Sequence, residues 1–340
     1  MTGESEEDYV DEYLDKYDLY NMIYDNNVTK VLNVIESSTI SSTKLMDIEY
    51  TSRYDSVDEM TTTTEQIPCD VEGLKVQGTE SMKTRLYKII NKYSDCFRKT
   101  VGRNPAKVLP LILEVDDTKW KVNKNKCGPR IQSVIKEKAI QEFIEQAKQD
   151  DVIEESQAIY VSQVLLTPKP NGTYRFCIDY RALNDASTSN GWPLPRIKEI
   201  LARLGRLKPK YFAKLDLTQG YYQTPISVNS RDYTAFTTSM GTYRWKRVPM
   251  GLKGAPSYFQ AKMANTVLQG LVYKICDIYI DDIIIYGTIE EEFLRNFETV
   301  LQRLKEYNVT LNPTKAEIGL SQIEYVEHTV EGNGITFLEE

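Results

Sequence analysis

The chain contains 340 residues, of which 41% are hydrophobic and 27% are charged, so it can form one large domain or two to three smaller ones. No apolar run reaches the roughly 18 residues of a membrane span, and the acidic N-terminus has no signal-peptide pattern. We therefore expect an intracellular protein with no membrane partner. Five scattered cysteines and a single histidine, His328, argue against a disulfide framework, a zinc site and a histidine-activated nucleophile.

The charge is unevenly distributed along the chain. The net charge of the whole chain is −7, but residues 1–80 carry 19 acidic and 5 basic side chains, a net of −14. Residues 81–340 hold 30 acidic and 37 basic side chains, a net of +7. A basic body is compatible with a polyanionic substrate, and +7 is also an ordinary value for a domain of this size.

Residues 1–80 are acidic and rich in Ser and Thr, with four consecutive threonines at 61–64. This composition predicts a largely disordered leader or linker. Five tyrosines recur at helical spacing and predict an acidic helix with an aromatic stripe: Tyr9, Tyr13, Tyr17, Tyr20 and Tyr24. Such a helix is either a nucleic-acid mimic that occupies the basic body or part of a plain linker.

Residues 81–160 read as a mainly helical segment. The apolar spacing predicts a helix over residues 82–97 and a short strand over 109–113. Ser133 is a candidate cap for a second helix. The apolar face predicted for that helix consists of Ile135, Ala139, Phe143 and Ala147.

Residues 161–337 alternate between strand and helix patterns. Strands are predicted at 161–167, 174–178, 211–216, 233–238, 243–248, 275–278, 283–286 and 323–330, and helices at 193–207, 257–271 and 293–304. Turn residues at 170–172 join the first two strands, and turn residues at 240–241 join the strands 233–238 and 243–248 into a hairpin. The order strand, helix, hairpin, helix predicts an α+β fold with an antiparallel sheet and helices on one face.

Two adjacent acids, Asp281 and Asp282, stand between apolar β-branched runs. The runs predict two strands with the acids at the turn between them. Like charges held against buried strands are unfavourable unless a cation neutralises them. Asp216 ends another predicted strand. Three carboxylates on neighbouring strand ends therefore predict a site for hard divalent cations and phosphoryl transfer.

Four motifs, in order, carry a resemblance to a known family. They are LLTPKPNGTYRFCIDYRALN at 165–184, LDLTQGYYQ at 215–223, VPMGLKGAPSYFQ at 248–260 and YIDD at 279–282. They resemble the reverse transcriptases of gypsy-type LTR retrotransposons, and the likeness covers about residues 81–337. It implies a right-hand polymerase fold with fingers, an antiparallel palm sheet and the start of a thumb. Residues 81–160 would lead into the fingers, and 161–337 would form the fingers–palm domain.

The resemblance implies an RNA-directed DNA polymerase that extends a primer on an RNA or DNA template with deoxynucleoside triphosphates. It places the activity in the cytoplasm, a virus-like particle or the nucleus. It also implies a longer Pol polyprotein with RNase H and integrase as neighbours, of which this chain is a fragment or a truncated coding region. One alternative is a decayed or co-opted element protein that keeps the fold and binds nucleic acid. Another is an RNA-dependent RNA polymerase, which Tyr221 disfavours.

The same resemblance assigns the metal ligands. Asp216 and Asp281 would bridge two Mg²⁺ or Mn²⁺ ions, with Asp282 as the third acid. The main-chain carbonyl of Leu217 would supply a further oxygen.

Other residues match the family's substrate contacts. Lys169 and Arg175 would contact the triphosphate, unless they lie on a merely solvated hairpin. Tyr221 would stack under the sugar and exclude a 2′-hydroxyl, unless it is a core tyrosine. Met250 would pack under the nucleotide, and Lys253 would face template or nucleotide.

Three further positions belong to the structural framework or depart from the pattern. Asp179 is expected to pair with Arg181 or a backbone amide. Residues 323–330 resemble the hairpin that grips the primer, where His328 matches the family and is expected to be structural. Glu327 stands where the family has glycine, and a carboxylate there would repel the primer phosphate.

Overall fold

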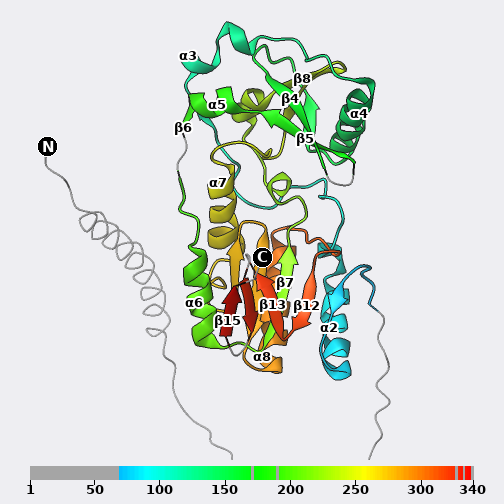
Figure 1. The fold of residues 1–340 in the computed structure, drawn as a ribbon, viewed down its shortest axis with the longest axis vertical. Helices are drawn as coiled ribbons and strands as arrows, with labels where there is room; N and C mark the ends of the chain where they lie inside the picture. The colour runs from blue at the N-terminus through cyan, green and yellow to red at the C-terminus, as the bar shows by residue number, and fades with distance from the viewer. Residues whose placement is uncertain (1–68, 170–171, 189–190, 326–327, 332–333, 338–340) are drawn as a thin grey trace, which may run out of the picture. The chain divides into compact units, whose positions relative to one another are not determined.

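The computed structural model describes residues 69–169, 172–188, 191–325, 328–331 and 334–337 (Figure 1). The chain divides into two units, residues 1–62 and 63–340, and the described residues belong to the second. The predicted tyrosine stripe, the 170–171 turn and Glu327 lie outside the described residues. No helix in the described part is long and apolar enough to cross a membrane.

Seven α-helices are present in the described ranges. They are α2 (Glu80–Lys92), α3 (Asp117–Trp120), α4 (Val134–Gln149), α5 (Arg181–Ala186), α6 (Ile197–Leu207), α7 (Ala255–Lys262) and α8 (Glu290–Glu306). A π-helical turn, η5 (Met263–Val267), continues α7, and a 3-10 turn, η3 (Gly220–Gln223), follows strand β7. In Figure 1, α4 and α5 lie at one end of this unit and α2, α6 and α8 at the other.

The strands form two five-stranded sheets. The palm sheet has the order β1-β12-β7-β11-β10, and the fingers sheet has the order β3-β9-β8-β4-β5. The palm strands are β1 (Lys75–Val76), β7 (Tyr211–Asp216), β10 (Cys276–Tyr279), β11 (Asp282–Gly287) and β12 (Glu317–Leu320). The fingers strands are β3 (Ile153–Glu155), β4 (Ser162–Pro168), β5 (Tyr174–Asp179), β8 (Phe236–Thr238) and β9 (Gly241–Trp245).

Two smaller sheets complete the strands of the described part. One pairs β2 (Glu114–Val115) with β6 (Ser187–Thr188), and the other has the order β13-β14-β15. The bounds of the latter are β13 (Gln322–Tyr325), β14 (His328–Glu331) and β15 (Gly334–Phe337). The single strand predicted over 323–330 is therefore wrong, whereas the hairpin that the family resemblance implied there is present, because β13 and β14 pair in antiparallel.

The palm sheet is buried on both faces, which corrects the expectation of helices on one face. Because side chains alternate along a strand, Leu215 and Ile283 face a core shared with α2, α7 and α8. Phe212 and Ile284 face a second core, shared with α6 and the β13-β14 hairpin. This two-sided burial explains the unbroken apolar run of β11. The sheet is antiparallel as predicted except at its edge, where β1 pairs with β12 in parallel.

The sequence predicts that the acidic leader extends to residue 80, but residues 69–80 include β1, the edge strand of the palm sheet. The predicted strand over 109–113 is also wrong. Leu111 makes only an isolated bridge to Ile226, and the regular strand β2 begins at Glu114. A two-residue pairing carries too little periodicity to be located from sequence.

Helix α4 buries only part of the predicted face, keeping Ala147 and adding two residues outside it. Its buried residues are Ile140, Ile144 and Ala147, while Ile135 is 71% exposed. Phe143, a member of the predicted face, stacks its ring on Phe176 of β5 with the centroids 3.9 Å apart. The helix follows Ser133, whose side chain makes no capping hydrogen bond.

Candidate active site

The palm strands bring the three predicted acids together at one end of the sheet, where β7 ends and β11 begins. Strands β7 and β11 are antiparallel, and their register places Asp216 opposite Asp282. Asp281 occupies the turn between β10 and β11, and its carbonyl accepts a hydrogen bond of 2.9 Å from the Leu217 amide. Asp216 and Asp282, 66 positions apart in the chain, therefore meet at this end of the sheet, because β7 ends where its antiparallel neighbour β11 begins.

A buried glutamine shapes the turn that carries Asp281. Gln260 of α7 is 1% exposed, and its amide nitrogen donates to the Ile278 carbonyl at 3.0 Å. Its amide oxygen accepts from the Ile280 amide at 2.7 Å. Ile280 has φ of +54°, which is unfavourable for a β-branched residue. The two hydrogen bonds hold this strained turn, a role that sequence reasoning missed. A lone glutamine between buried helix positions was the available signal.

Gly220 lets the Asp281 carboxylate approach the η3 turn. A Cβ at position 220 would lie 2.0 Å from Oδ1 of Asp281 and 3.1 Å from the Phe259 ring. Any larger residue would therefore displace either the carboxylate or the turn. The sequence placed Gly220 in the first palm motif but did not indicate this contact.

The carboxylates are held in an unfavourable electrostatic environment. Burial and the nearby charges of Asp216 and Asp282 raise the pKa of Asp281 to about 6. Its Oδ1 is buried and has no hydrogen-bond partner. Burial also raises the pKa of Asp282. A nearby cation would relieve both the repulsion and the unsatisfied oxygen.

Lys315 supplies one positive charge beside the three acids. Its Nζ donates to Oδ2 of Asp216 at 2.9 Å. Its charge also partly offsets the rise in the pKa of Asp281 and of Asp282. Lys315 lies in the loop before β12, 99 residues from Asp216, and was not among the predicted site residues.

The donor set has the composition that Mg²⁺ or Mn²⁺ prefers. It offers three carboxylates and the Leu217 carbonyl, all hard oxygen ligands. As the side chains stand, no three acidic, histidine or cysteine residues in the described part of the chain converge on one metal position. The orphaned Oδ1 of Asp281 nevertheless fits a cation, and the Asp216 carboxylate would have to exchange Lys315 for it.

Tyr221 lies beside the acids on η3. Its ring meets Phe259 edge to face with centroids 5.2 Å apart, and the side chain is half-buried. Burial, with a contribution from Asp281, raises the pKa of Tyr221 to about 12, so the phenol is neutral at physiological pH. Tyr222 differs, because it stacks on Trp245 in the fingers core. The structure therefore brings Tyr221 to the carboxylates and directs Tyr222 away.

The two predicted triphosphate contacts lie on a different sheet from the acids. Lys169 follows β4 and Arg175 lies in β5, and both side chains are exposed. The register of this hairpin pairs Arg175 with Thr167, and the Lys169 amide donates to the Thr173 carbonyl at 2.8 Å. Asp179 at the end of β5 accepts two hydrogen bonds from the Arg181 guanidinium and one from the Arg181 amide, which confirms its predicted structural pairing.

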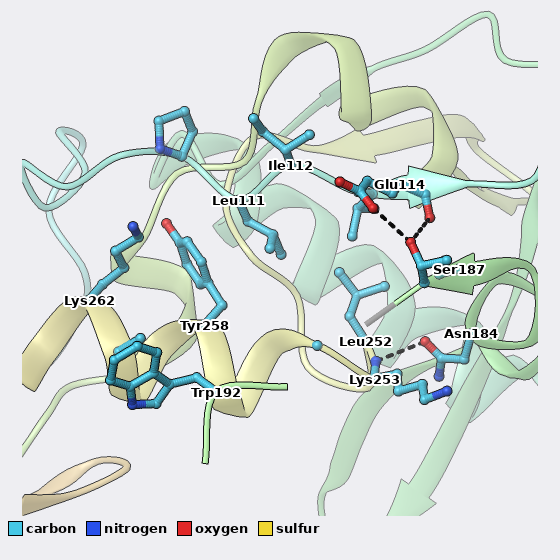
Figure 2. Close-up of a pocket in the computed structure, with 15 residues that line it drawn as sticks. Leu111, Ile112, Glu114, Asn184, Ser187, Trp192, Leu252, Lys253, Tyr258 and Lys262 are labelled. Atoms are coloured by element: carbon cyan, nitrogen blue, oxygen red, sulfur yellow. Dashed lines mark hydrogen bonds between the residues drawn. The ribbon is translucent and has the colours of Figure 1, made fainter. Parts of the chain in front are cut away.

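The second palm motif forms one wall of a cavity of about 390 Å³ (Figure 2). Asn184 clamps this segment by donating to the Gly251 carbonyl at 2.9 Å and accepting from the Lys253 amide at 2.8 Å. Gly251 has φ of +93°, a conformation that glycine adopts without strain. Lys253 lines the cavity with Trp192 and Tyr258. Met250 is 46% exposed and does not line it.

An antiparallel palm sheet with acids at its strand ends, joined to a separate fingers sheet, is the arrangement of the right-hand polymerase fold. Comparison with known proteins specifies the kind. A family model described as "Reverse transcriptase (RNA-dependent DNA polymerase)" matches residues 167–330. These residues belong to the reverse transcriptase family, as the four motifs predicted. Members of this family generally use divalent metal ions.

Relatives in sequence are Pol polyproteins of transposons. The chain is 32% identical over 319 residues to the retrovirus-related Pol polyprotein from transposon 412 of Drosophila melanogaster. That match covers 91% of this chain and 25% of the relative. The polyprotein from transposon gypsy of the same organism is 34% identical over 197 residues, covering 56% of this chain and 19% of the relative. The chain thus spans about a quarter or less of these relatives.

Solved structures confirm the predicted polymerase fold. A prototype foamy virus protease–reverse transcriptase mutant has a TM-score of 0.64 and 27% identity, covering 78% of this chain and 35% of that one. A foamy viral protease–reverse transcriptase in complex with double-stranded DNA has a TM-score of 0.67 and 23% identity. The latter match covers 77% of this chain and 45% of that one, and at this identity it shows the fold alone.

Proposed function

We propose that this chain is an RNA-directed DNA polymerase that extends a primer with deoxynucleoside triphosphates on an RNA or DNA template. The observation that carries the proposal is the pairing of Asp216 with Asp282 across β7 and β11, with Asp281 in the adjoining turn. The reverse transcriptase family match over residues 167–330 supports the same activity.

Nucleotidyl transfer joins the primer 3′-oxygen to the α-phosphorus of the triphosphate and releases pyrophosphate. Two divalent ions, Mg²⁺ or Mn²⁺, would supply charge stabilisation for the entering and leaving oxygens. Asp216, Asp281, Asp282 and the Leu217 carbonyl are the groups that would hold them. Gln260 and Gly220 fix the turn and the space that Asp281 needs.

Substrate selection is assigned to the remaining predicted residues. Lys169 and Arg175 would cover the triphosphate with positive charge, and Met250 would pack under the nucleotide. The Tyr221 ring, braced by Phe259, would exclude a 2′-hydroxyl. Lys253 lines a cavity with two aromatic side chains, a combination suited to a nucleic-acid strand.

Template and primer are the proposed partners. Two of the similar foamy viral structures are complexes, one with double-stranded DNA and one with an RNA/DNA hybrid. We also propose that the chain works within a longer Pol polyprotein beside RNase H and integrase. This rests on the relatives, which are polyproteins about four times its length.

Primer extension on poly-riboadenylate with an oligo-deoxythymidine primer tests the activity, in Mg²⁺ and separately in Mn²⁺. Extension by the full chain, lost in the Asp281→Asn variant, supports the proposal. Template–primer binding without extension in either metal would instead support a protein that keeps the fold and only binds nucleic acid.

A further inference from the structure

The loop that carries Lys315 is anchored to Asp216, the residue that the Lys315 side chain contacts. The Asn312 amide donates to the Asp216 carbonyl at 2.8 Å, and the Lys315 amide donates to the Asn312 carbonyl at 3.3 Å. The Asn312 side chain also accepts from the amide and hydroxyl of Thr314, which shapes the turn before Lys315. The backbone of this loop therefore directs the lysine toward the carboxylate cluster.

The loop itself is firmly fixed in the palm. Leu311 is fully buried, and its amide donates to the Cys96 carbonyl at 2.7 Å. Thr310 exchanges hydrogen bonds with the buried side chain of Gln223 on η3. These bonds tie the loop to the turn that carries Tyr221, so the Lys315 backbone has little freedom to leave the site.

The Lys315 side chain is 61% exposed, while that of Asp216 is 16% exposed. An exposed ammonium on a flexible stem can leave a carboxylate at small cost. Its contact oxygen, Oδ2 of Asp216, belongs to a carboxylate assigned to the metals. A lysine and a divalent ion cannot both approach that oxygen closely, because the two cations repel each other.

We propose that Lys315 is a built-in counter-cation that orients Asp216 and competes with a divalent metal ion for its Oδ2. The inference rests on the proposed function, since it assumes that Asp216 is a metal ligand. Lys315 acts as a positioning residue: it neutralises the cluster between metal-binding events and swings away when an ion arrives.

Mn²⁺ binding to the full chain without nucleic acid or nucleotide tests the proposal, with free Mn²⁺ measured by electron paramagnetic resonance. Lys315→Met removes the charge and the hydrogen bond while keeping a long side chain, and it should tighten Mn²⁺ binding about fivefold. Lys315→Arg, which keeps the charge and can still donate to Oδ2, should bind Mn²⁺ nearly as the original chain does.

Lys214→Met is the matched control. The charge of Lys214 also partly offsets the raised pKa of Asp282, but its Nζ donates to the Glu324 carbonyl at 3.2 Å and not to Asp216. Lys214→Met therefore measures the effect of losing a nearby charge while the Lys315–Asp216 ion pair is kept. Equal Mn²⁺ affinities for Lys315→Met and Lys214→Met, or weaker binding by Lys315→Met, would overturn the inference.

Asp216→Asn separates this inference from the proposed function. Loss of Mn²⁺ binding in Asp216→Asn, together with unchanged affinity in Lys315→Met, would leave the metal site standing and reject only the role of Lys315. Mn²⁺ binding that is insensitive to Asp216→Asn would reject the metal site, and the inference with it. Thermal unfolding of each variant checks that the affinities belong to folded protein.

Discussion

Gln260 and Ile280 are joined by a hydrogen bond of 2.7 Å from the Ile280 amide to the glutamine side chain, across 20 residues of sequence. The bond fixes a left-handed residue directly before Asp281, so a helix of the palm sets the position of a candidate metal ligand. Because Gln260 is buried, water cannot replace it.

Gln260→Met should therefore both destabilise the chain and reduce extension. The variant leaves the Ile280 amide and the Ile278 carbonyl without their partner, at a cost of about 1–3 kcal/mol. Urea unfolding measures the free energy, and primer extension measures the activity. The exposed Gln146→Met on α4 is the control and should change the free energy by less than about 0.5 kcal/mol. An unchanged free energy of unfolding in Gln260→Met would show that the turn keeps its conformation without the two hydrogen bonds.

Asp216→Asn and Asp281→Asn should each reduce extension by about a hundredfold or more, because each removes a charged oxygen ligand without changing side-chain volume. Asp282→Asn should be damaging but less complete. Single-turnover extension measures the rates, and circular dichroism verifies the fold. Substantial extension by Asp216→Asn or Asp281→Asn would refute the two-metal assignment.

Gly220→Ala should displace the Asp281 carboxylate, because the new Cβ would lie 2.0 Å from its Oδ1. We expect a stability loss of about 1–3 kcal/mol and a large loss of extension. Gly128→Ala is the matched control, since no atom lies within 4 Å of its Cβ position.

A double variant, Gly220→Ala with Asp281→Ala, shows which contact causes the stability loss of Gly220→Ala. If the clash with Asp281 is responsible, Gly220→Ala should cost less stability in an Asp281→Ala background than alone. Additive losses would place the strain in the η3 backbone or against Phe259 instead.

Tyr221→Ala should admit ribonucleotides, because the ring that would meet a 2′-hydroxyl is removed. The ratio of deoxynucleotide to ribonucleotide incorporation should fall by about tenfold or more, whereas Tyr221→Phe should preserve it because the ring remains. Competitive incorporation on one template measures the ratio. An unchanged ratio in Tyr221→Ala would make Tyr221 a core residue that packs on Phe259.

The Asp179–Arg181 pair should make stability depend on pH. Hydrogen bonds from Arg181 hold the pKa of Asp179 below its ordinary value. A carboxyl whose pKa is lower in the folded state stabilises the fold above its unfolded pKa of about 3.9. That contribution is lost as the pH falls through the folded-state pKa.

Asp179→Asn should therefore lower stability at pH 7 by about 0.5–1 kcal/mol, a modest value because the Arg181 side chain is 85% exposed. The difference from the original chain should shrink as the pH is lowered from 5 to 3. Urea unfolding at several pH values measures it. A difference that stays constant over this range would show that the effect of the substitution is not electrostatic.

Local sequence determined the elements whose signals are periodic or chemical. The apolar run before Asp216 predicted a strand over 211–216, and β7 has those bounds. The helix predicted from Phe293, Phe297, Val300, Leu301 and Leu304 buries all five. Paired acids between β-branched runs predicted the β10-β11 turn, because strand alternation and like-charge repulsion act between near neighbours.

Only the tertiary structure decided the contacts between distant segments. Helix α4 buries Ile140 and Ile144, which lie outside the predicted face, and its Phe143 stacks on Phe176 of β5, a partner that no periodicity within the helix contains. The roles of Gln260 and Gly220 toward Asp281 likewise depend on which segments meet around the turn. Lys315 reaches Asp216 across 99 residues because β12 lies beside β7 in the sheet. Strand order, and with it the charge that neutralises a carboxylate, follows from packing of the whole core rather than from any local pattern.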